Sequence, residues 1–298
     1  MLDIYSWQDD AYPLVTKWFN DRLDKRKQLI KQVIGYEGID RIDLQEQGVG
    51  GYGLVPKYDG SNIPELNQKR GFKAVYTPEE YAAKASIQYK YAKVDLSGES
   101  KKAGTRMADS CYMTQLRAFY NLFANGWNSS FKGPDGKPLF ATDHPINNEP
   151  DAETFSNKGN LQFSISAITK TQTEAQRFKT FDGLDFDCDF NFVLIAPELE
   201  PKAKEFFGED AKLIPESAEN GANPVKDMTY VVIKGFSAKQ WAVGDKMLMQ
   251  EYMKMVEITK PQVIRNKPDN PLVTEFVGYM DFTMGWSDTR MIYGHDPA

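Results

Sequence analysis

Cysteine and histidine are scarce in this chain. Among 298 residues there are two of each, Cys111, Cys188, His144 and His295. Two isolated cysteines provide neither a disulfide framework nor a paired-cysteine metal site, and they make a cysteine–histidine nucleophile pair improbable. We therefore expect no catalytic centre, no cofactor and no metal ion. Cys111 is expected to be a small core residue, and His295, close to the C-terminal end, is expected to face solvent.

Long apolar runs and an excess of basic charge are also missing. No stretch reaches the ~18 consecutive apolar residues of a membrane-spanning helix, and residues 1–5 do not begin a secretory signal. The chain has 36 Lys and Arg against 42 Asp and Glu, a net charge of −6, which argues against a dedicated nucleic-acid binder. These absences predict a protein made and kept in a cytoplasm, without a membrane partner.

Aliphatic, aromatic and cysteine residues together make up 41% of the chain, and the aromatic residues alone make up 13%. A hydrophobic core and large packed contact surfaces are therefore expected. Residues 12–34 have the apolar spacing of an amphipathic helix that starts near Pro13 and ends before Gly35. Arg22 and Arg26 interrupt its apolar face. Either their stems run out to solvent, or the helix is an arm whose arginines meet carboxylates of a neighbouring subunit.

Residues 39–72 are rich in Gly, Pro, Asn and Gln and lack helical periodicity. We expect an extended β-hairpin that leaves the body of the protein and rests on something else, because a lone hairpin is marginal in water. Within it, residues 48–53 match the GxGxxG dinucleotide fingerprint. The polar residues 43–47 before it and Pro56, Gly60 and Pro64 after it exclude the required strand and helix, so nucleotide binding is rejected.

The rest of the chain mixes helices and strands without regular alternation, which predicts an α+β fold. Helices are expected over residues 86–95, 99–125, 164–178 and 198–207, the second of them being a buried spine. Strict apolar–polar alternation over residues 184–194 predicts a half-buried strand. Further strands are expected over residues 230–233, 240–243, 255–263 and 272–286.

Two short patterns could carry chemistry. The aspartates of residues 185–189 resemble the start of a calcium loop, but Phe190 and Ala196 stand where that loop needs Gly and Glu. Asp143 and His144 could form an acid–base pair. No nucleophile motif accompanies them, and such a sequence in a loop more often stabilises a turn. A soluble enzyme using Asp143 and His144 is therefore a remote alternative.

The order of parts, together with residues 136–145 (GKPLFATDHP), 182–200 and 282–290 (FTMGWSDTR), resembles the major capsid proteins of tailed bacteriophages with the HK97 fold. The resemblance implies an N-terminal arm over residues 1–36, an E-loop over 37–84 and a P-domain with the spine helix over 85–159. It further implies an A-domain over 160–250, the long P-domain strands over 251–286 and a C-terminal segment over 287–298.

The implied function is self-assembly into hexamers and pentamers of an icosahedral shell around phage DNA. The virion is then the expected location, with assembly in the host cytoplasm, and the expected partners are other copies, scaffolding and portal proteins, possibly decoration proteins, and DNA bound weakly. An encapsulin-like compartment is the alternative. Inter-subunit contacts are expected at seven positions: Trp18, Arg22, Arg26, Lys57, Tyr58, Lys69 and Arg70.

Two properties of some family members are not expected here. If Met1 is the encoded start, a scaffolding segment must come from a separate protein or be unnecessary. Covalent joining of subunits through Lys57 or Lys69 is not expected, because no pattern identifies an Asn and Glu partner.

Overall fold

The computed structural model describes residues 6–26, 28–49, 54–55, 57–58, 63, 65, 70–208, 223–266 and 268–297. These form two compact units. Unit 1 comprises Met1–Leu44, Tyr76–Phe119 and Lys254–Met284, and unit 2 comprises Gln45–Val75, Tyr120–Met253 and Gly285–Ala298. Both contain helices and strands, so the predicted α+β class is confirmed.

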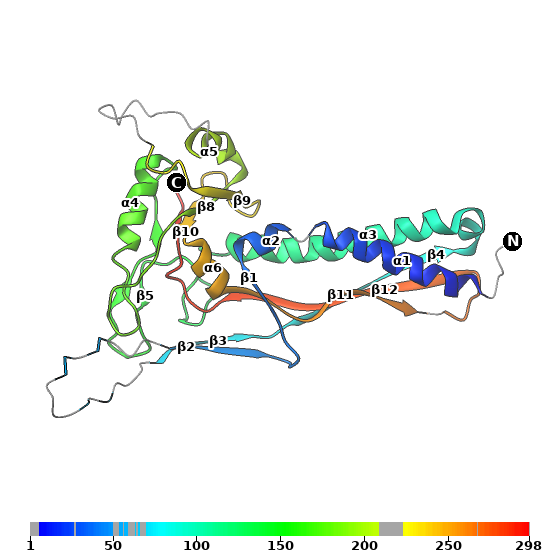
Figure 1. Ribbon diagram of the computed structural model, residues 1–298, viewed down its shortest axis with the longest axis horizontal. Coiled ribbons are helices and arrows are strands. Elements are labelled where there is room, and N and C mark those ends of the chain that lie inside the picture. Colours follow the sequence, from blue (N-terminus) through cyan, green and yellow to red (C-terminus); the bar gives the residue numbers. More distant parts are fainter. Residues whose placement is uncertain are drawn as a thin grey trace. The chain divides into compact units, whose positions relative to one another are not determined.

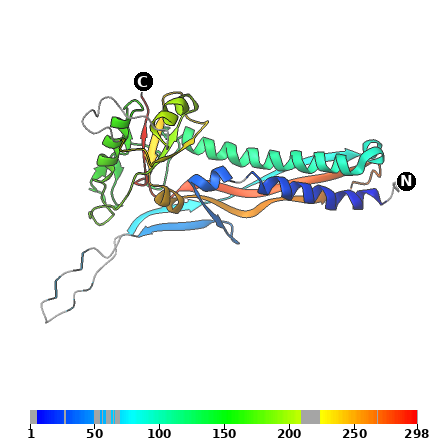
Figure 2. The same ribbon diagram turned by 45° about the horizontal axis from the view of Figure 1, so that its top comes forward.

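Unit 1 is built on a four-stranded sheet of order β1-β11-β12-β4. Its strands are β1 (Gly35–Gly38), β4 (Glu79–Gln88), β11 (Met253–Asn266) and β12 (Val273–Trp286). The last two extend the strands predicted over 255–263 and 272–286. β1 runs parallel to β11, and β4 runs antiparallel to β12 over ten residue pairs from Gln88↔Val273 to Glu79↔Phe282. Helices α1 (Trp7–Asp24) and α3 (Tyr89–Ala124) lie side by side along these strands (Figures 1 and 2).

The arm helix begins earlier and ends earlier than predicted. Instead of one helix over 12–34 there are two, α1 and α2 (Gln28–Val33). The first turn of α1 is held by tertiary bonds that local pattern cannot reveal: Trp7 Nε1 donates to Pro271 O at 2.9 Å and Gln8 Nε2 donates to Val273 O at 2.6 Å. The buried residues of α1 still follow the predicted helical spacing, at Trp7, Ala11, Val15, Phe19 and Leu23.

The predicted helix over 86–95 is partly wrong. Residues up to Gln88 belong to β4, because pairing with β12 continues to that residue and places Ile87 in the core. Helix α3 then runs from Tyr89 through the predicted spine, with one non-helical residue, Asp95 (φ −149°, ψ 84°). The Asp95 carboxylate accepts a hydrogen bond from the Gly98 N–H at 2.8 Å, as a helix cap does, and so restarts the helix after the kink.

Unit 2 contains a five-stranded sheet of order β7-β13-β10-β8-β9. These strands are β7 (Lys158–Gly159), β13 (Ile292–His295), β10 (Trp241–Gly244), β8 (Phe192–Ile195) and β9 (Thr229–Val232). The helices are α4 (Ile165–Ala175), η1 (Pro197–Leu199), α5 (Glu200–Phe206) and α6 (Lys246–Tyr252). Predictions over 164–178, 198–207, 230–233 and 240–243 are thus confirmed within a few residues. A small sheet joins β5 (His144–Pro145) to β6 (Thr154–Phe155).

The alternating segment 184–194 is a strand only at its end. Side-chain burial alternates as predicted through residues 184–190, but only Phe192–Ile195 enter the sheet. Alternation follows from any extended backbone, whereas a strand also needs a neighbour to pair with. In the predicted hairpin, β2 (Leu44–Val49) pairs with β3 (Arg70–Tyr76), and most of the segment between them lies outside the described residues.

Candidate assembly surfaces and buried polar sites

The two arm arginines meet a carboxylate within their own chain. Arg22 donates to both carboxylate oxygens of Asp109 on α3, from Nε at 2.9 Å and from Nη2 at 3.1 Å. Arg26 Nε lies 3.5 Å from the same carboxylate. The hydrogen bond to Asp109 raises the pKa of Arg22. Asp109 explains both arginines on the apolar side of the helix, and their contact with a neighbouring subunit stays a prediction.

Close packing of α1 on α3 is made possible by Gly104. A side-chain carbon at this position would lie 2.4 Å from Val15 O and 3.1 Å from Phe19 N, so a larger residue would force the helices apart. Trp18, another predicted contact residue, is half-buried, and the ammonium group of Lys101 lies 4.6 Å from its ring centroid. Such an ammonium–aromatic contact is favourable at a partly exposed site.

The described residues between β2 and β3 expose large apolar side chains. Leu54, Val55, Tyr58 and Ile63 are 77%, 84%, 61% and 81% exposed, and Lys57 is exposed as well. Large apolar side chains that are exposed to solvent in one segment are typical of an interaction surface. Of the remaining predicted contact residues, Arg70 is the first residue of β3 and Lys69 lies outside the described residues.

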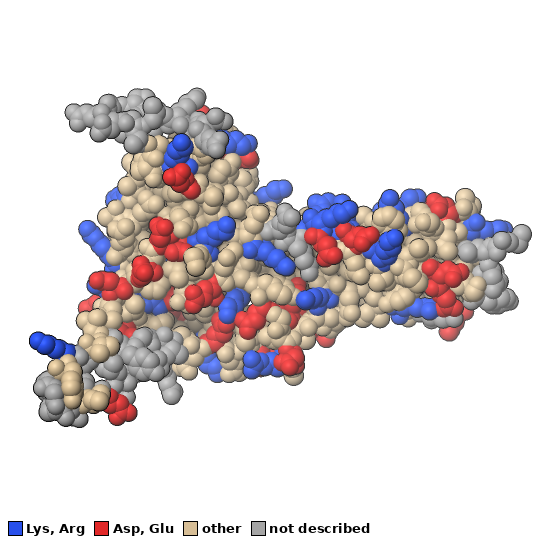
Figure 3. Space-filling model, in the orientation of Figure 1, with Lys and Arg blue, Asp and Glu red and all other residues tan. Residues whose placement is uncertain are grey.

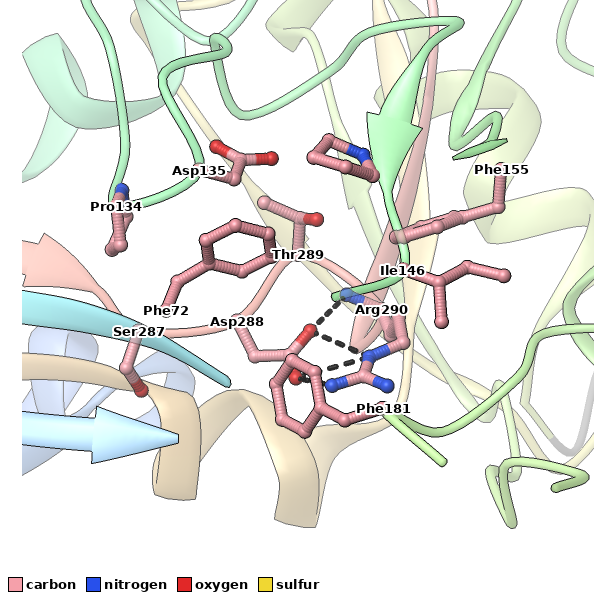
Figure 4. A pocket seen from close by; sticks show the side chains of 11 residues that line it. Phe72, Pro134, Asp135, Ile146, Phe155, Phe181, Ser287, Asp288, Thr289 and Arg290 are labelled. Atoms are coloured by element: carbon pink, nitrogen blue, oxygen red, sulfur yellow. Dashed lines mark hydrogen bonds and ion pairs between the residues drawn. The ribbon is translucent and has the colours of Figure 1, made fainter. Parts of the chain in front are cut away.

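The base of this hairpin, where β2 and β3 pair, packs against the ring of Phe181. Gly48 of β2 and Gly71 of β3 approach the Phe181 ring so closely that a side-chain carbon would lie 3.0 Å and 2.6 Å from its Cζ. The Arg290 guanidinium lies 4.0 Å from the centroid of the same ring, and its charge is paired with buried Asp288 (Figure 4). The hollow beside them, about 290 Å³, is lined by aromatic and proline side chains together with polar ones, among them Asp135, Asp288 and Arg290.

The sequence alone did not indicate this contact between Phe181, Arg290 and Asp288. The only signal was the segment 282–290 quoted for the family resemblance, which contains Asp288 and Arg290. Neither residue has a spacing that would predict a buried ion pair with an aromatic neighbour more than a hundred residues away.

Asp143 and His144 do not form an acid–base pair. Asp143 is bonded to Lys137, whose hydrogen bond lowers the pKa of that exposed carboxyl. His144 is fully buried, with Nδ1 2.5 Å from Asp135 Oδ2 and Nε2 3.1 Å from Asn157 Oδ1. Both nitrogens therefore face oxygen atoms within the protein. This geometry supports the reading of a turn-stabilising element and leaves the remote enzyme alternative without its pair.

Asn157 links this histidine to backbone groups of two further segments of the chain, residues 139–141 and 289–292. Its amide nitrogen donates to the carbonyl oxygens of Leu139, Thr289 and Ile292, at 2.8, 3.1 and 3.2 Å, and its oxygen accepts from the Ala141 N–H. A buried side chain bonded in this way fixes loop geometry, because each bond lost would leave a desolvated polar group.

His295 is buried, and the prediction that it faces solvent was wrong. It lies in β13, paired on both sides with β7 and β10, and its ring is stacked at 4.3 Å on Trp241. Leu161 N–H donates to Nδ1 at 3.2 Å, and Nε2 lies 2.8 Å from Thr171 Oγ1. Burial, with a smaller effect of Lys170, lowers the pKa of His295 to about 4. Cys111 is a core residue, as predicted.

Unit 1 holds a buried carboxylate, that of Glu257, which the sequence did not indicate. Glu257 on β11 is 1% exposed. It accepts hydrogen bonds from Tyr36 Oη at 2.6 Å and from Gln115 Nε2 at 2.7 Å. Burial, and then the bond to Glu257, raises the pKa of Tyr36. This arrangement joins β1, α3 and β11.

The described residues contain neither a group of metal-ligating side chains nor a helix that could cross a membrane. Within them, no three His, Cys, Asp or Glu side chains are grouped as metal ligands. None of the helices in the described part of the chain is long and apolar enough to cross a membrane. Figure 3 shows Lys and Arg side chains beside Asp and Glu side chains on the visible face of unit 1, so charges of both signs are interspersed there.

No family model and no curated protein matches the chain. Solved structures do. The capsid of Ralstonia phage GP4 is 11% identical with a TM-score of 0.58, the match covering 88% of this chain and 87% of that one. The procapsid protein of bacteriophage JBD30 is 12% identical, with a TM-score of 0.55 and coverage of 97% and 75%. The virus-like particle from Pyrococcus furiosus is 9% identical, with a TM-score of 0.52 and coverage of 95% and 97%.

These likenesses extend over nearly the whole chain and show the fold. The HK97-type capsid fold predicted from the resemblance is confirmed. At such low identity the likeness says nothing about individual residues.

Proposed function

We propose that this chain is a major capsid protein, which self-assembles into hexamers and pentamers of an icosahedral shell around phage DNA. One observation carries the proposal: the chain aligns with capsid and virus-like-particle proteins over nearly its whole length, 88–97% in the three structures named above. A protein that shared only a domain with them would align over part of its length.

The polar sites support a structural role over a catalytic one. His144, His295 and Arg290 are buried and bonded to groups of the protein itself, so none is available to a substrate. Function in such a protein lies in its surfaces, and the exposed apolar residues Leu54, Val55 and Ile63 are candidates for burial against another subunit. We propose no enzymatic activity.

The face of unit 1 seen in Figure 3 carries positive and negative side chains side by side, which favours weak, sequence-independent contact with packaged DNA. Scaffolding, portal and decoration proteins are the further partners proposed for such a shell. The proposed location is the virion, after assembly in the host cytoplasm.

The seven predicted contact residues remain part of this proposal. Lys57 and Tyr58 have the exposure that an inter-subunit contact requires. Arg22 and Arg26 are partly committed to Asp109, which leaves them able to reach a second carboxylate only at the solvent side.

An encapsulin-like compartment is the second candidate. The virus-like particle from Pyrococcus furiosus, matched over 97% of its length, is compatible with either content, and the phage capsids among the similar structures give the viral function the stronger support. The two candidates share the assembly activity and differ in what the shell encloses.

Electron microscopy of the purified protein, after size-exclusion chromatography at several ionic strengths, tests assembly. Closed shells, tubes, or rings of five and six subunits are the expected result. A protein that stays monomeric across salt and concentration would contradict the proposal. If shells form in the native host, nucleic acid inside them supports the viral function, and enclosed protein without nucleic acid supports the compartment.

A further inference from the structure

The unit 1 sheet ends in a long open edge. β4 is the last strand in the order β1-β11-β12-β4, and one of its sides pairs with β12 along all ten residues. No other strand in the described part of the chain pairs with its second side. An open edge offers a row of unpaired N–H and C=O groups, which another strand can bind.

This edge lacks the features that normally block strand addition. The register with β12 is continuous, which leaves no bulge, and residues 79–88 contain no proline. The centre of the strand is small, with Ala82, Ala83 and Ala85. Natural edge strands are commonly short, bulged or heavily charged. β4 is ten residues long, and its charged residues are Glu79, Glu80 and a single lysine, Lys84.

Charges along the exposed face of β4 are held in fixed positions. Glu80, Ala82 and Lys84 are all exposed and, standing at alternate positions of the strand, project to the same face of the sheet. Glu80 accepts a hydrogen bond from Tyr279 Oη at 2.9 Å, and Lys84 Nζ lies 3.0 Å from Glu275 Oε1. The strand thus presents a carboxylate and an ammonium group four residues apart, with Ala82 midway between them.

We propose that the free edge of β4 pairs with β4 of a second copy of the chain, antiparallel about a two-fold axis that passes midway between the two Ala82 residues. In a symmetric antiparallel pair one residue lies opposite its own copy, with the axis between the two. With the axis at Ala82, Glu80 of each copy lies opposite Lys84 of the other, which is a favourable cross-strand pair.

Neighbouring registers are less complementary. An axis at Lys84 places two lysines opposite each other, and an axis at Glu80 does the same with two carboxylates. An axis at Ala83 places Lys84 opposite Ala82 and brings no opposite charges together. Charge complementarity therefore selects a second copy as the occupant, in one register. The inference rests on the proposed function, since it names one of the contacts by which copies would join.

Cysteine cross-linking tests the register directly. In the Cys188→Ser background, Ala82→Cys places two thiols opposite each other across the axis. Opposed residues of an antiparallel pair have Cα atoms ~4.5–5.5 Å apart, within the ~4.4–6.8 Å range of disulfides. Mild oxidation of assembled particles is expected to give a dimer band at twice the 33.9 kDa of the chain. Ala83→Cys is the matched control, equally exposed but on the other face of the strand.

The two hypotheses can fail separately. Shells that form but show no Ala82→Cys dimer, or equal dimer from Ala82→Cys and Ala83→Cys, overturn the edge pairing and leave the proposed function standing. A protein that forms neither assemblies nor dimers overturns both. A strong Ala82→Cys dimer with little from Ala83→Cys supports the pairing.

Charge reversal provides an independent readout. Lys84→Glu would place like charges opposite each other twice per interface, and we expect the chain concentration needed for assembly to rise about threefold to tenfold. Adding Glu80→Lys restores opposite charges and should return the threshold toward that of the unmodified chain. Glu79→Lys, opposite Ala85 in this register, is the control. No rescue by the double reversal would contradict the register.

Discussion

The two units treat their sheet edges and their polar groups differently. In unit 2 the edge strands are short, β7 with two residues and β9 with four, whereas unit 1 ends in the ten-residue β4. Unit 2 also buries a set of polar side chains that are bonded within the chain, among them His144, Asn157 and Arg290. The five-stranded sheet of unit 2 thus ends in short strands on both sides, whereas the sheet of unit 1 ends on one side in a long strand whose backbone groups a second molecule could satisfy.

This contrast suggests a division of labour within one chain. Buried polar networks specify one loop geometry, because every alternative leaves desolvated groups unpaired. Open strand edges do the opposite and allow a contact to form only when another molecule arrives. Both properties occur in this chain, with buried polar networks in unit 2 and exposed surfaces at the β2–β3 hairpin and along β4.

The largest expected effect comes from breaking the buried ion pair of unit 2. Asp288→Ala leaves the Arg290 guanidinium, 3% exposed as a side chain, without its carboxylate. We expect a loss of about 3–5 kcal/mol in the free energy of unfolding, because an unpaired buried charge is costly. Urea unfolding followed by near-UV circular dichroism measures it. Asp185→Ala, which removes an 84% exposed partner of Lys179, should change stability far less. Equal effects would show that the buried pair is unimportant.

Acid should weaken unit 2 through His295. The pKa of His295 is lowered from the usual 6.5 to about 4 in the folded protein. Between these pH values the unfolded chain is protonated at His295, whereas the folded chain is not. Stability is therefore fully present above pH 6.5 and is lost as the pH falls toward 4. The loss from this group is about 3 kcal/mol. Unfolding free energies at pH 7, 5.5 and 4.5 should show the decline, and His295→Gln should flatten that part of it. An unchanged slope in this variant would contradict the assignment.

A smaller effect is expected at the base of the hairpin. Gly71→Ala places a methyl group 2.6 Å from Phe181 Cζ and 2.9 Å from Gly48 O, and the backbone oxygen cannot move away easily. We expect a destabilisation of about 1–3 kcal/mol by overpacking, measured by hydrogen exchange of β2 and β3. Gly38→Ala, with nothing within 4 Å of the added carbon, is the control and should be nearly neutral. Adding Phe181→Leu should recover part of the loss.

The smallest effect on the isolated chain is expected in unit 1. Arg22→Ala removes a bidentate but solvent-accessible ion pair with Asp109, and such pairs contribute little. The melting temperature should fall by less than about 2 °C, close to the result for the exposed control Lys25→Ala. If assembly nevertheless fails in Arg22→Ala and not in Lys25→Ala, Arg22 acts between subunits. Normal assembly in both would remove Arg22 from the predicted contacts.

Much of the fold was predictable because its signals are local. The helices around residues 164–178 and 198–207 and the strands of residues 230–233, 240–243 and 272–286 appear where periodicity and flanking residues indicated them. Errors occurred where a distant partner decides the state. Residues 86–88 join a strand because β12 lies beside them, and the segment 184–190 is no strand because its pairing is limited to a single bridge between Asp185 and Lys179.

Site predictions from sequence divided in the same way. Cys111 was placed correctly in the core, since an apolar stripe is visible in one helix. His295 was misplaced, because a position near the chain end suggests exposure unless the strand pairing of β13 is known. The contact residues Arg22 and Arg26 drew attention because they interrupt an apolar face, and the sequence could not reveal that Asp109 lies opposite.

By itself, the sequence determined which segments are helical or extended, that the chain has little means for metal or thiol chemistry, and which family its order of parts resembles. These properties depend on spacing and composition, which short-range chain geometry translates directly into structure. Only the tertiary structure decided that Asp288, Arg290 and Phe181 meet beneath the hairpin and that the edge of β4 is open. Ion pairs and strand edges are relations between residues far apart in the chain, so no local pattern contains them.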